Sequence, residues 1–185
     1  MPPHKTKLSF IETYMKTHLE FIFSNVNEWL KFAEAKAATL LAADGVVIFG
    51  LIGLLKDIKL GYFTSHLIFI SIISFSISLF ICLSSFIPTI SIPLIHKKWN
   101  RTSNDNLIFF GHIENYTPTA YLTEIRKHFN IVEVYDSKFC AMLAQQIIVN
   151  SSITSYKFSV FKKSMWFTLF GVFTSFVSCI IHVWN

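Results

Sequence analysis

Residues 66–95 contain no aspartate, glutamate, lysine or arginine, and this constrains the fold more than any other feature of the sequence. A helix needs ~20 predominantly apolar residues to cross the hydrocarbon core of a bilayer. The stretch is longer than that, so we predict a membrane span that is either tilted or interrupted at Pro88. The connector before it, residues 56–65, carries two lysines and one aspartate.

Two further apolar blocks are long enough to cross a membrane. Residues 37–55 contain one charged residue, Asp44, and residues 165–184 contain no acidic residue, lysine or arginine. Tryptophans near both ends of the block at residues 165–184 suit the aromatic belts of a bilayer. The chain is 52% hydrophobic and only 15% charged, which is not the composition of a soluble domain. A long soluble core helix is the alternative interpretation of residues 27–55.

Apolar residues recur at helical spacing between residues 8 and 36, which predicts an amphipathic helix outside the membrane. Its apolar stripe consists of Ile11, Met15, Leu19, Ile22, Val26, Trp29 and Ala33. No proline separates this helix from the block at 37–55, so we expect one continuous helix. The stripe is expected to pack on another helix outside the membrane, with binding to the membrane surface as the alternative.

A longer and more polar region, residues 96–164, follows the second predicted span. Residues 104–106, Asn-Asp-Asn, predict a turn, and the β-prone residues 107–113 predict a short strand or extended segment. Thr117-Pro118 predicts the N-cap and first turn of a helix that ends near His128. This region therefore has secondary structure of its own.

A second helix of this region is expected to begin at Asp136 or Ser137, since either side chain can cap a helix. Its predicted apolar stripe consists of Met142, Gln146, Val149, Ile153, Tyr156 and Val160. The helix continues through Lys162 and Lys163 into the third apolar block. Two helices are therefore expected to cross the boundary between water and lipid without a break.

The first long helix carries two features that bear on function. A strip of small residues, which allows another helix to approach closely, consists of Ala35, Ala38, Ala42 and Gly45. Asp44 is the only acidic residue within the predicted spans, and such residues usually face the interior of a helix bundle and mark functional sites. Alternatively, Asp44 lies near the membrane surface and bonds to a neighbour, because Lys36 is only two turns away.

Lysine and arginine are unevenly distributed along the chain. The segment before residue 37 has five, residues 96–164 have nine, the connector has two, and the C-terminal tip has none. The positive-inside rule then places the N-terminus and residues 96–164 in the cytoplasm and the C-terminus in the periplasm. We predict an all-α membrane protein with three transmembrane helices, two of them continuous with long cytoplasmic helices. Its segments are a cytoplasmic amphipathic helix at 1–36, spans at 37–55, 66–95 and 165–184, and a small cytoplasmic region at 96–164.

The sequence contains no phosphate-binding loop, dinucleotide-binding glycine pattern, HExxH motif, nucleophile elbow or kinase signature. Its seven histidines are scattered, and its three cysteines are isolated, without the spacing of a zinc site or a disulfide framework. We therefore predict no catalytic residue, no metal site, no cofactor and no enzymatic activity.

Three segments together resemble the Pycsar transmembrane effectors. Residues 27–41, NEWLKFAEAKAATLL, are similar to the opening motif of that family, in which a tryptophan precedes an acid and a Lys-Ala pair. Residues 109–113, FFGHI, followed by Tyr121-Leu122, are similar to a second family segment. The later Ala144 and Tyr156-Lys157 also fit. Glu34 and His112 depart from the family pattern, which favours aspartate at the first position and an acid at the second.

The resemblance implies a bacterial anti-phage effector that responds to cyclic CMP or cyclic UMP made by a partner cyclase. Such an effector impairs the inner membrane, so that the infected cell dies or stops growing. A homo-oligomer embedded in the lipid bilayer is expected, with no nucleic acid as a partner. The candidate ligand-binding residues are Trp29, Phe110 and Tyr121 as walls for the base and Lys36, Arg126 and Lys157 as partners of the phosphate.

Two other classes of function remain open on the sequence alone. One is a constitutive membrane scaffold or assembly subunit, whose cytoplasmic helices bind a protein rather than a nucleotide. The other is a small pore or transporter that has no connection with nucleotide signalling. A gene for a nucleotide cyclase beside this one favours the effector over both.

Overall fold

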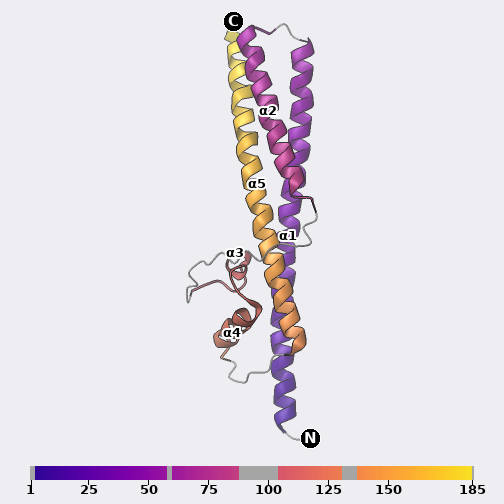
Figure 1. The fold of residues 1–185 in the computed structure, drawn as a ribbon, viewed down its shortest axis with the longest axis vertical. Helices are drawn as coiled ribbons and strands as arrows, with labels where there is room; N and C mark the ends of the chain where they lie inside the picture. The colour runs from indigo at the N-terminus through magenta and orange to yellow at the C-terminus, as the bar shows by residue number, and fades with distance from the viewer. Residues whose placement is uncertain (1–2, 58–59, 88–103, 131–136, 185) are drawn as a thin grey trace. The chain divides into compact units, whose positions relative to one another are not determined.

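The computed structural model describes residues 3–57, 60–87, 104–130 and 137–184. These residues form five helices and contain no strand (Figure 1). The helices are α1 (Pro3–Asp57), α2 (Tyr62–Ser84), α3 (Phe110–Ile113), α4 (Pro118–His128) and α5 (Lys138–Trp184). Three of them, α1, α2 and α5, are long and apolar enough to cross a membrane. The predicted all-α membrane fold with three spans, two of them parts of longer helices, is confirmed.

The second span differs from the prediction at both ends. Helix α2 begins at Tyr62, four residues before the predicted start, and ends at Ser84 rather than at residue 95. The N–H groups of Ser85 and Phe86 donate to carbonyls three residues back, which tightens the last turn and ends the helix before Pro88. Residues 88–95 of the predicted span lie outside the described part of the chain.

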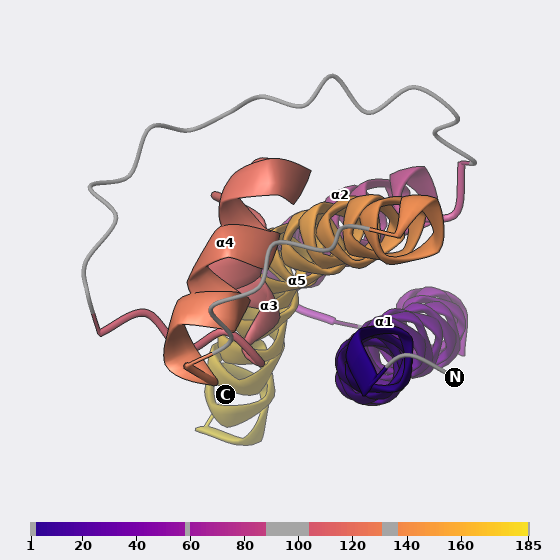
Figure 2. The same ribbon diagram turned by 90° about the horizontal axis from the view of Figure 1, so that it is seen from below.

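The chain divides into two compact units. We call residues 1–32 and 90–156 the extramembrane unit, and residues 33–89 and 157–185 the span unit. Helices α1 and α5 each contribute one segment to the extramembrane unit and another to the span unit, whereas α2 belongs to the span unit alone. In the extramembrane unit, α3 and α4 lie on the same side of the α1 and α5 segments (Figures 1 and 2).

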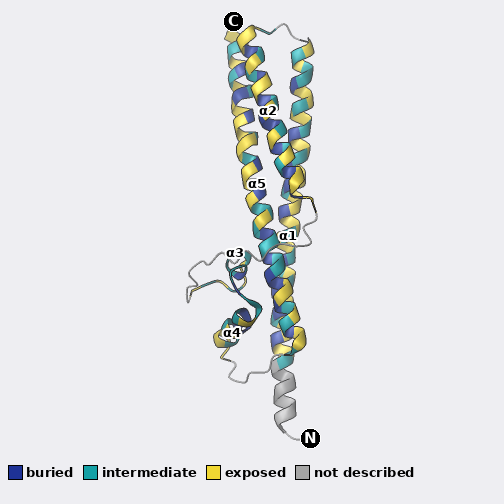
Figure 3. Ribbon diagram, viewed as in Figure 1, coloured by how far each residue is buried: buried dark blue, intermediate teal, exposed yellow. Residues whose placement is uncertain are grey.

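The extramembrane unit has one apolar core, to which all four of its helices contribute. The core contains Leu19 and Val26 of α1, Ile113 of α3, Ile125 of α4 and Ile147 of α5, each at most 1% exposed. In Figure 3 dark-blue buried stretches alternate with yellow exposed ones along α1 and α5, as expected for helices that bury one face. Burial of these branched side chains is the main favourable term in the stability of this unit.

The predicted stripe of α1 is largely confirmed, whereas that of α5 is wrong except at Val160, which is buried. Met15, Leu19, Ile22, Val26 and Ala33 are buried, whereas Trp29 is 39% exposed. On α5, Met142 and Tyr156 are exposed, and the buried face of its extramembrane segment consists of Cys140, Ala144, Ile147, Ile148, Ser151 and Thr154.

The strand or extended segment predicted at residues 107–113 is also wrong. The Asn106 side-chain oxygen accepts a hydrogen bond from the Ile108 N–H at 2.9 Å, and the Asn106 N–H donates to His112 Nδ1 at 2.8 Å. These local bonds close a turn that leads into the short helix α3 and offer the backbone an alternative to an extended conformation. Ile113, at the end of α3, is then buried in the core.

The two predicted helix starts are confirmed. Thr117 precedes α4, and its side chain accepts a hydrogen bond from the Ala120 N–H at 3.3 Å. Ser137 precedes α5 and accepts in the same way from the Cys140 N–H at 3.2 Å. The other candidate cap, Asp136, lies outside the described residues.

In the span unit, α1 turns a different face inward from the one expected. The small residues Ala35, Ala38 and Ala42 are exposed, and the contacts with α2 and α5 are made through the opposite face. Its buried residues are Ala33, Ala37, Leu40, Asp44 and Leu51. The strip of small residues is therefore not a contact between helices within the described part of this chain.

Candidate ligand pocket and intramembrane acid

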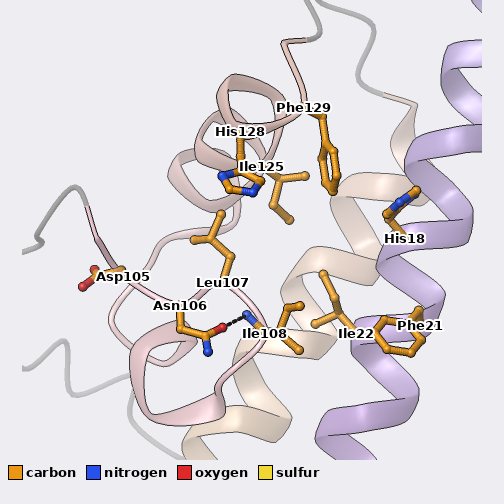
Figure 4. A pocket seen from close by; sticks show the side chains of 10 residues that line it. All are labelled: His18, Phe21, Ile22, Asp105, Asn106, Leu107, Ile108, Ile125, His128 and Phe129. Atoms are coloured by element: carbon orange, nitrogen blue, oxygen red, sulfur yellow. Dashed lines mark hydrogen bonds between the residues drawn. The ribbon is translucent and has the colours of Figure 1, made fainter.

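A cavity of about 270 Å³ opens in the extramembrane unit (Figure 4). Helix α1 contributes three side chains, the turn before α3 contributes four, and the end of α4 contributes three. They are His18, Phe21 and Ile22; Asp105, Asn106, Leu107 and Ile108; and Ile125, His128 and Phe129. Aromatic and aliphatic walls with a few polar groups are the usual lining of a small-molecule site.

The polar groups of the pocket are held in place by local contacts. One ring nitrogen of His18, Nδ1, lies 2.8 Å from the Tyr14 carbonyl oxygen, and its ring lies edge-on to that of Phe129 with 4.7 Å between centroids. The rings of His18 and Phe129 are neighbours at one side of the cavity in Figure 4. Asn106 is oriented by its bond with the Ile108 N–H. The pocket therefore exists before any ligand enters it.

The turn that forms one wall is anchored to the rest of the unit at three points. The Tyr121 hydroxyl donates to the Leu107 carbonyl at 2.6 Å, and the Asn25 side chain donates to the Ile108 carbonyl at 3.2 Å. The Tyr116 hydroxyl donates to an Asp105 carboxylate oxygen at 2.9 Å. Helices α1 and α4 and the loop between α3 and α4 thus fix a segment that has no regular secondary structure.

Replacing Tyr121 with phenylalanine is expected to lower the free energy of unfolding of this unit by ~1–3 kcal/mol, because the Leu107 carbonyl loses its partner. Thermal unfolding in detergent measures the loss, and Tyr156→Phe, at a half-exposed tyrosine of α5, is the control. Burial raises the pKa of the Tyr121 phenol above its usual value of about 10. The unfolded chain therefore deprotonates first, and stability should fall as the pH rises above that value. Equal melting of Tyr121→Phe and the parent would contradict this role.

Of the predicted base walls, the structure brings two together. The rings of Trp29 and Phe110 lie 5.8 Å apart, and Trp29 is 39% exposed. Tyr121 is fully buried and packs in the apolar core, so neither face of its ring is open to a ligand in this structure. Arg126, a predicted phosphate partner, lies on α4 next to the pocket residue Ile125, and its Nε is buried.

The other two predicted phosphate partners belong to the span unit. Lys157 Nζ lies 3.1 Å from a Glu34 carboxylate oxygen and donates to the Ser85 carbonyl at 3.1 Å. Lys36 Nζ lies over the rings of Phe158 and Phe161, 5.8 and 5.6 Å from their centroids. Both lysines thus connect helices of the span unit in this structure.

Asp44 lies inside the span unit and is only 1% exposed. The Thr168 hydroxyl of α5 lies 3.0 and 3.1 Å from its two carboxylate oxygens, and the Ser78 hydroxyl of α2 lies 2.8 Å from that of Thr168. The acid thus joins all three span helices through hydroxyl groups. Asp44 thus faces the interior of the span unit, as the first interpretation expects, and it bonds to a neighbour, as the alternative expects.

Sequence reasoning did not single out the pocket residues His18, Phe21, His128 and Phe129. None of them belongs to a motif, and the pocket forms only where three separate segments meet. The one available signal was the turn at residues 104–106, which contains the pocket residue Asn106. A turn between two helical regions is a common place for binding residues, because a rigid scaffold holds it in position.

Comparison with known families identifies most of the chain. The family described as Pycsar effector protein domain matches residues 18–183. Curated proteins and solved structures gave no significant match. The matched range contains the pocket, Asp44, the candidate span Tyr62–Ser84 and nearly all of the candidate spans Glu12–Lys56 and Lys138–Trp184. The chain therefore belongs to the Pycsar effector family and is a membrane-embedded effector of anti-phage defence.

Proposed function

We propose that this effector binds a cyclic pyrimidine nucleotide, cyclic CMP or cyclic UMP, and responds by impairing the bacterial inner membrane. A partner cyclase makes the nucleotide during infection, and damage to the membrane then kills the cell or stops its growth. The N-terminus and the extramembrane unit lie in the cytoplasm, where the nucleotide is made, and the C-terminus lies in the periplasm. Several copies of the chain act together in the bilayer. The effector itself needs no catalytic step or cofactor.

One observation carries this proposal: α1 is a single helix that contains residues of the pocket and also the intramembrane acid. His18, Phe21 and Ile22 line the pocket, and Asp44 lies further along the same helix. A ligand can shift a conformational equilibrium only by its difference in affinity for the two states. A nucleotide that prefers one arrangement of the α1, α4 and turn segments therefore shifts the conformational equilibrium of α1, the helix that continues into the span unit.

The lining of the pocket supports a cyclic pyrimidine nucleotide as the ligand. The rings of Phe21 and Phe129 offer apolar faces to a one-ring base, and Asn106 offers an amide to its hydrogen-bonding edge. His18 and His128 offer ring nitrogens to the phosphate. The volume of about 270 Å³ is close to the lower end of ligand pockets, ~300 Å³, and suits a small ligand.

The residues predicted from the family motifs keep a part in the proposal. Trp29 and Phe110 form an aromatic pair in the same unit as the pocket, and we retain them as a second surface for the base. Arg126 remains a predicted phosphate partner, because it neighbours Ile125 on α4. Lys36 and Lys157 are assigned instead to the contacts between the span helices, where their ammonium groups are already engaged.

Titration of cyclic CMP and cyclic UMP into the detergent-purified protein tests the site. Phe129→Ala should raise the dissociation constant at least ~10-fold, since stacking of a base on an aromatic ring contributes ~1–3 kcal/mol. Lys127→Ala, at the exposed lysine two residues earlier, is the matched control and should bind like the parent. Weaker binding by Trp29→Ala together with unchanged binding by Phe129→Ala would move the site to the aromatic pair.

Expression together with the partner cyclase tests the response of the membrane. Depolarisation of the inner membrane is expected with the active cyclase and not with a catalytically dead one. Equal depolarisation with both would favour a constitutive pore. A protein that depolarises the membrane in neither case, but copurifies with a stable partner, would instead be a scaffold subunit.

A further inference from the structure

Hydroxyl side chains gather between α2 and α5 in the span unit. We call them the hydroxyl seam: Thr64, Ser71, Ser74 and Ser78 of α2, with Ser164, Thr168, Thr174 and Ser178 of α5. All of these except Thr168 are buried, and Thr168 is partly buried. The side chains of α2 and α5 that face outward include Phe69, Phe80, Phe173 and Phe176. The polar groups of these two spans are therefore concentrated where the helices meet.

Most of the seam is closed by hydrogen bonds from one helix to the other. The hydroxyl oxygens of Ser71 and Thr174 lie 2.7 Å apart, and those of Ser78 and Thr168 lie 2.8 Å apart. Ser74 donates to the Phe167 carbonyl at 2.7 Å, and Ser178 donates to the Thr64 carbonyl at 3.1 Å. At these distances the groups bond directly to one another, without a water molecule between them.

One member of this region is not satisfied in the way that a purely structural contact requires. Asp44 is buried beside the seam, and among the described residues its contacts are hydroxyls rather than a lysine or arginine. The Ser164 hydroxyl, one turn before Thr168, is fully buried and interacts with the Cys82 thiol, a weak hydrogen-bonding group. An acid without a basic partner in the interior of a span is costly to keep and indicates a polar function.

We propose that the hydroxyl seam is the path by which monovalent cations cross the membrane in the active effector, and that Asp44 makes this path selective for cations. The inference rests on the proposed membrane-impairing function. Separation of α2 from α5 exposes two rows of hydroxyl oxygens, which replace the hydration water of an ion. The Asp44 carboxylate attracts cations and repels anions, as acidic side chains do in cation channels.

The competing explanation is that the hydroxyls only hold α2 and α5 together, since serine and threonine commonly bond across helices in membranes. The two explanations differ in what the Asp44 charge does. If the seam is only a contact, removal of the charge alters stability and leaves the ion preference of the lesion unchanged. If it is the path, removal of the charge alters the ion preference itself.

The test measures the reversal potential of the nucleotide-activated, full-length protein in planar bilayers across a potassium chloride gradient. The parent protein should give a potential near that of the cation, and Asp44→Asn should shift it toward zero, because asparagine keeps the shape and loses the charge. Asp44→Glu should keep the parent value. Thr39→Val is the matched control, since the exposed Thr39 hydroxyl donates to the Ala35 carbonyl of its own helix and makes no bond to α2 or α5 within the described ranges.

An unchanged reversal potential in Asp44→Asn would overturn the proposal. Thr174→Val serves if Asp44→Asn does not insert, because it removes a seam hydroxyl away from the acid. This variant should lower the conductance and keep the preference for cations. An unchanged conductance would count equally against the seam. A second arm replaces the salt gradient by a pH gradient. A reversal potential that follows the pH gradient identifies protons as the permeant cation, and one that follows potassium identifies the metal ion.

Binding measured on the same preparation separates this proposal from the one on function. If the parent protein binds the nucleotide but carries no current, the proposal that the seam conducts cations is overturned, and the proposal that the nucleotide binds is supported. If no nucleotide binds, the ligand proposal fails, and the seam is tested without ligand by wedging α2 and α5 apart. Gly171→Leu serves for this, because a Cβ atom at Gly171 would lie 2.9 Å from the Phe75 ring. A cation-selective current from that variant supports the seam, and no current overturns it.

Discussion

Gly171→Leu is expected to force α2 away from α5 and to make the inner membrane leaky without any nucleotide. Gly171 of α5 is buried, and an added Cβ atom would lie 2.9–3.0 Å from three carbon atoms of the Phe75 ring. Phe75 is itself only 1% exposed and packs with Leu51 and Ile68, so its ring has little room to move. Overpacking of this kind costs ~1–3 kcal/mol and sometimes more.

Gly50→Leu is the matched control in the same unit, because nothing lies within 4 Å of a Cβ atom built at Gly50. It should melt like the parent or slightly higher, since leucine is a better helix former than glycine. Thermal unfolding in detergent and membrane depolarisation without the cyclase are the two measurements. A Gly171→Leu protein that melts and behaves like Gly50→Leu would show that the contact between α2 and α5 is loose.

The second large effect is expected at Lys157. Its side chain is 12% exposed, and its ammonium group joins Glu34 of α1 to the Ser85 carbonyl at the C-terminal end of α2. A cation is favourable at this end of a helix, where the last carbonyls lack partners. Lys157→Met keeps the aliphatic stem and removes the charge, so the three helices lose a common contact at this point.

Loss of a hydrogen bond to a charged group costs ~1.5–3 kcal/mol, and the half-exposed Glu34 places the expected loss toward the lower value. The melting temperature of Lys157→Met should therefore fall, and less nucleotide should be needed for depolarisation. Lys163→Met, at an exposed lysine six residues along the same helix, controls for charge and should leave both quantities unchanged. If instead Lys157→Met loses nucleotide binding and keeps its melting temperature, Lys157 is a phosphate ligand.

Predictions of helix starts were correct, whereas predictions of a buried helix face and of an extended segment were wrong, and each outcome has a physical reason. Helix starts were correct at Thr117 and Ser137 because a cap depends on residues within one turn. Most of the predicted stripe of α5 was wrong, Val160 excepted, because apolar periodicity identifies a face of a helix without identifying the neighbour that covers it. The strand or extended segment predicted at residues 107–113 was wrong because hydrogen bonds of one asparagine and one histidine side chain outweighed a weak preference for strand.

The candidate site shows the same division. The family motifs correctly pointed to Pycsar effectors, since the order of short motifs can be read along the chain. They did not point to the pocket, whose walls come from residues 18–22, 105–108 and 125–129. Tyr121 illustrates the difference, because its place in a motif reflects a hydrogen bond to the Leu107 carbonyl and core packing rather than an open aromatic face.

The sequence alone thus determined that this is a three-span, all-α membrane protein in which two long helices enter the bilayer. The cost of placing charged groups in lipid leaves few alternatives for apolar blocks of this length. Only the tertiary structure decided that Asp44 faces Thr168 and Ser78, that the strip of small residues on α1 turns outward, and that two lysines connect span helices. Those choices depend on which helix faces meet, and packing between distant segments settles them.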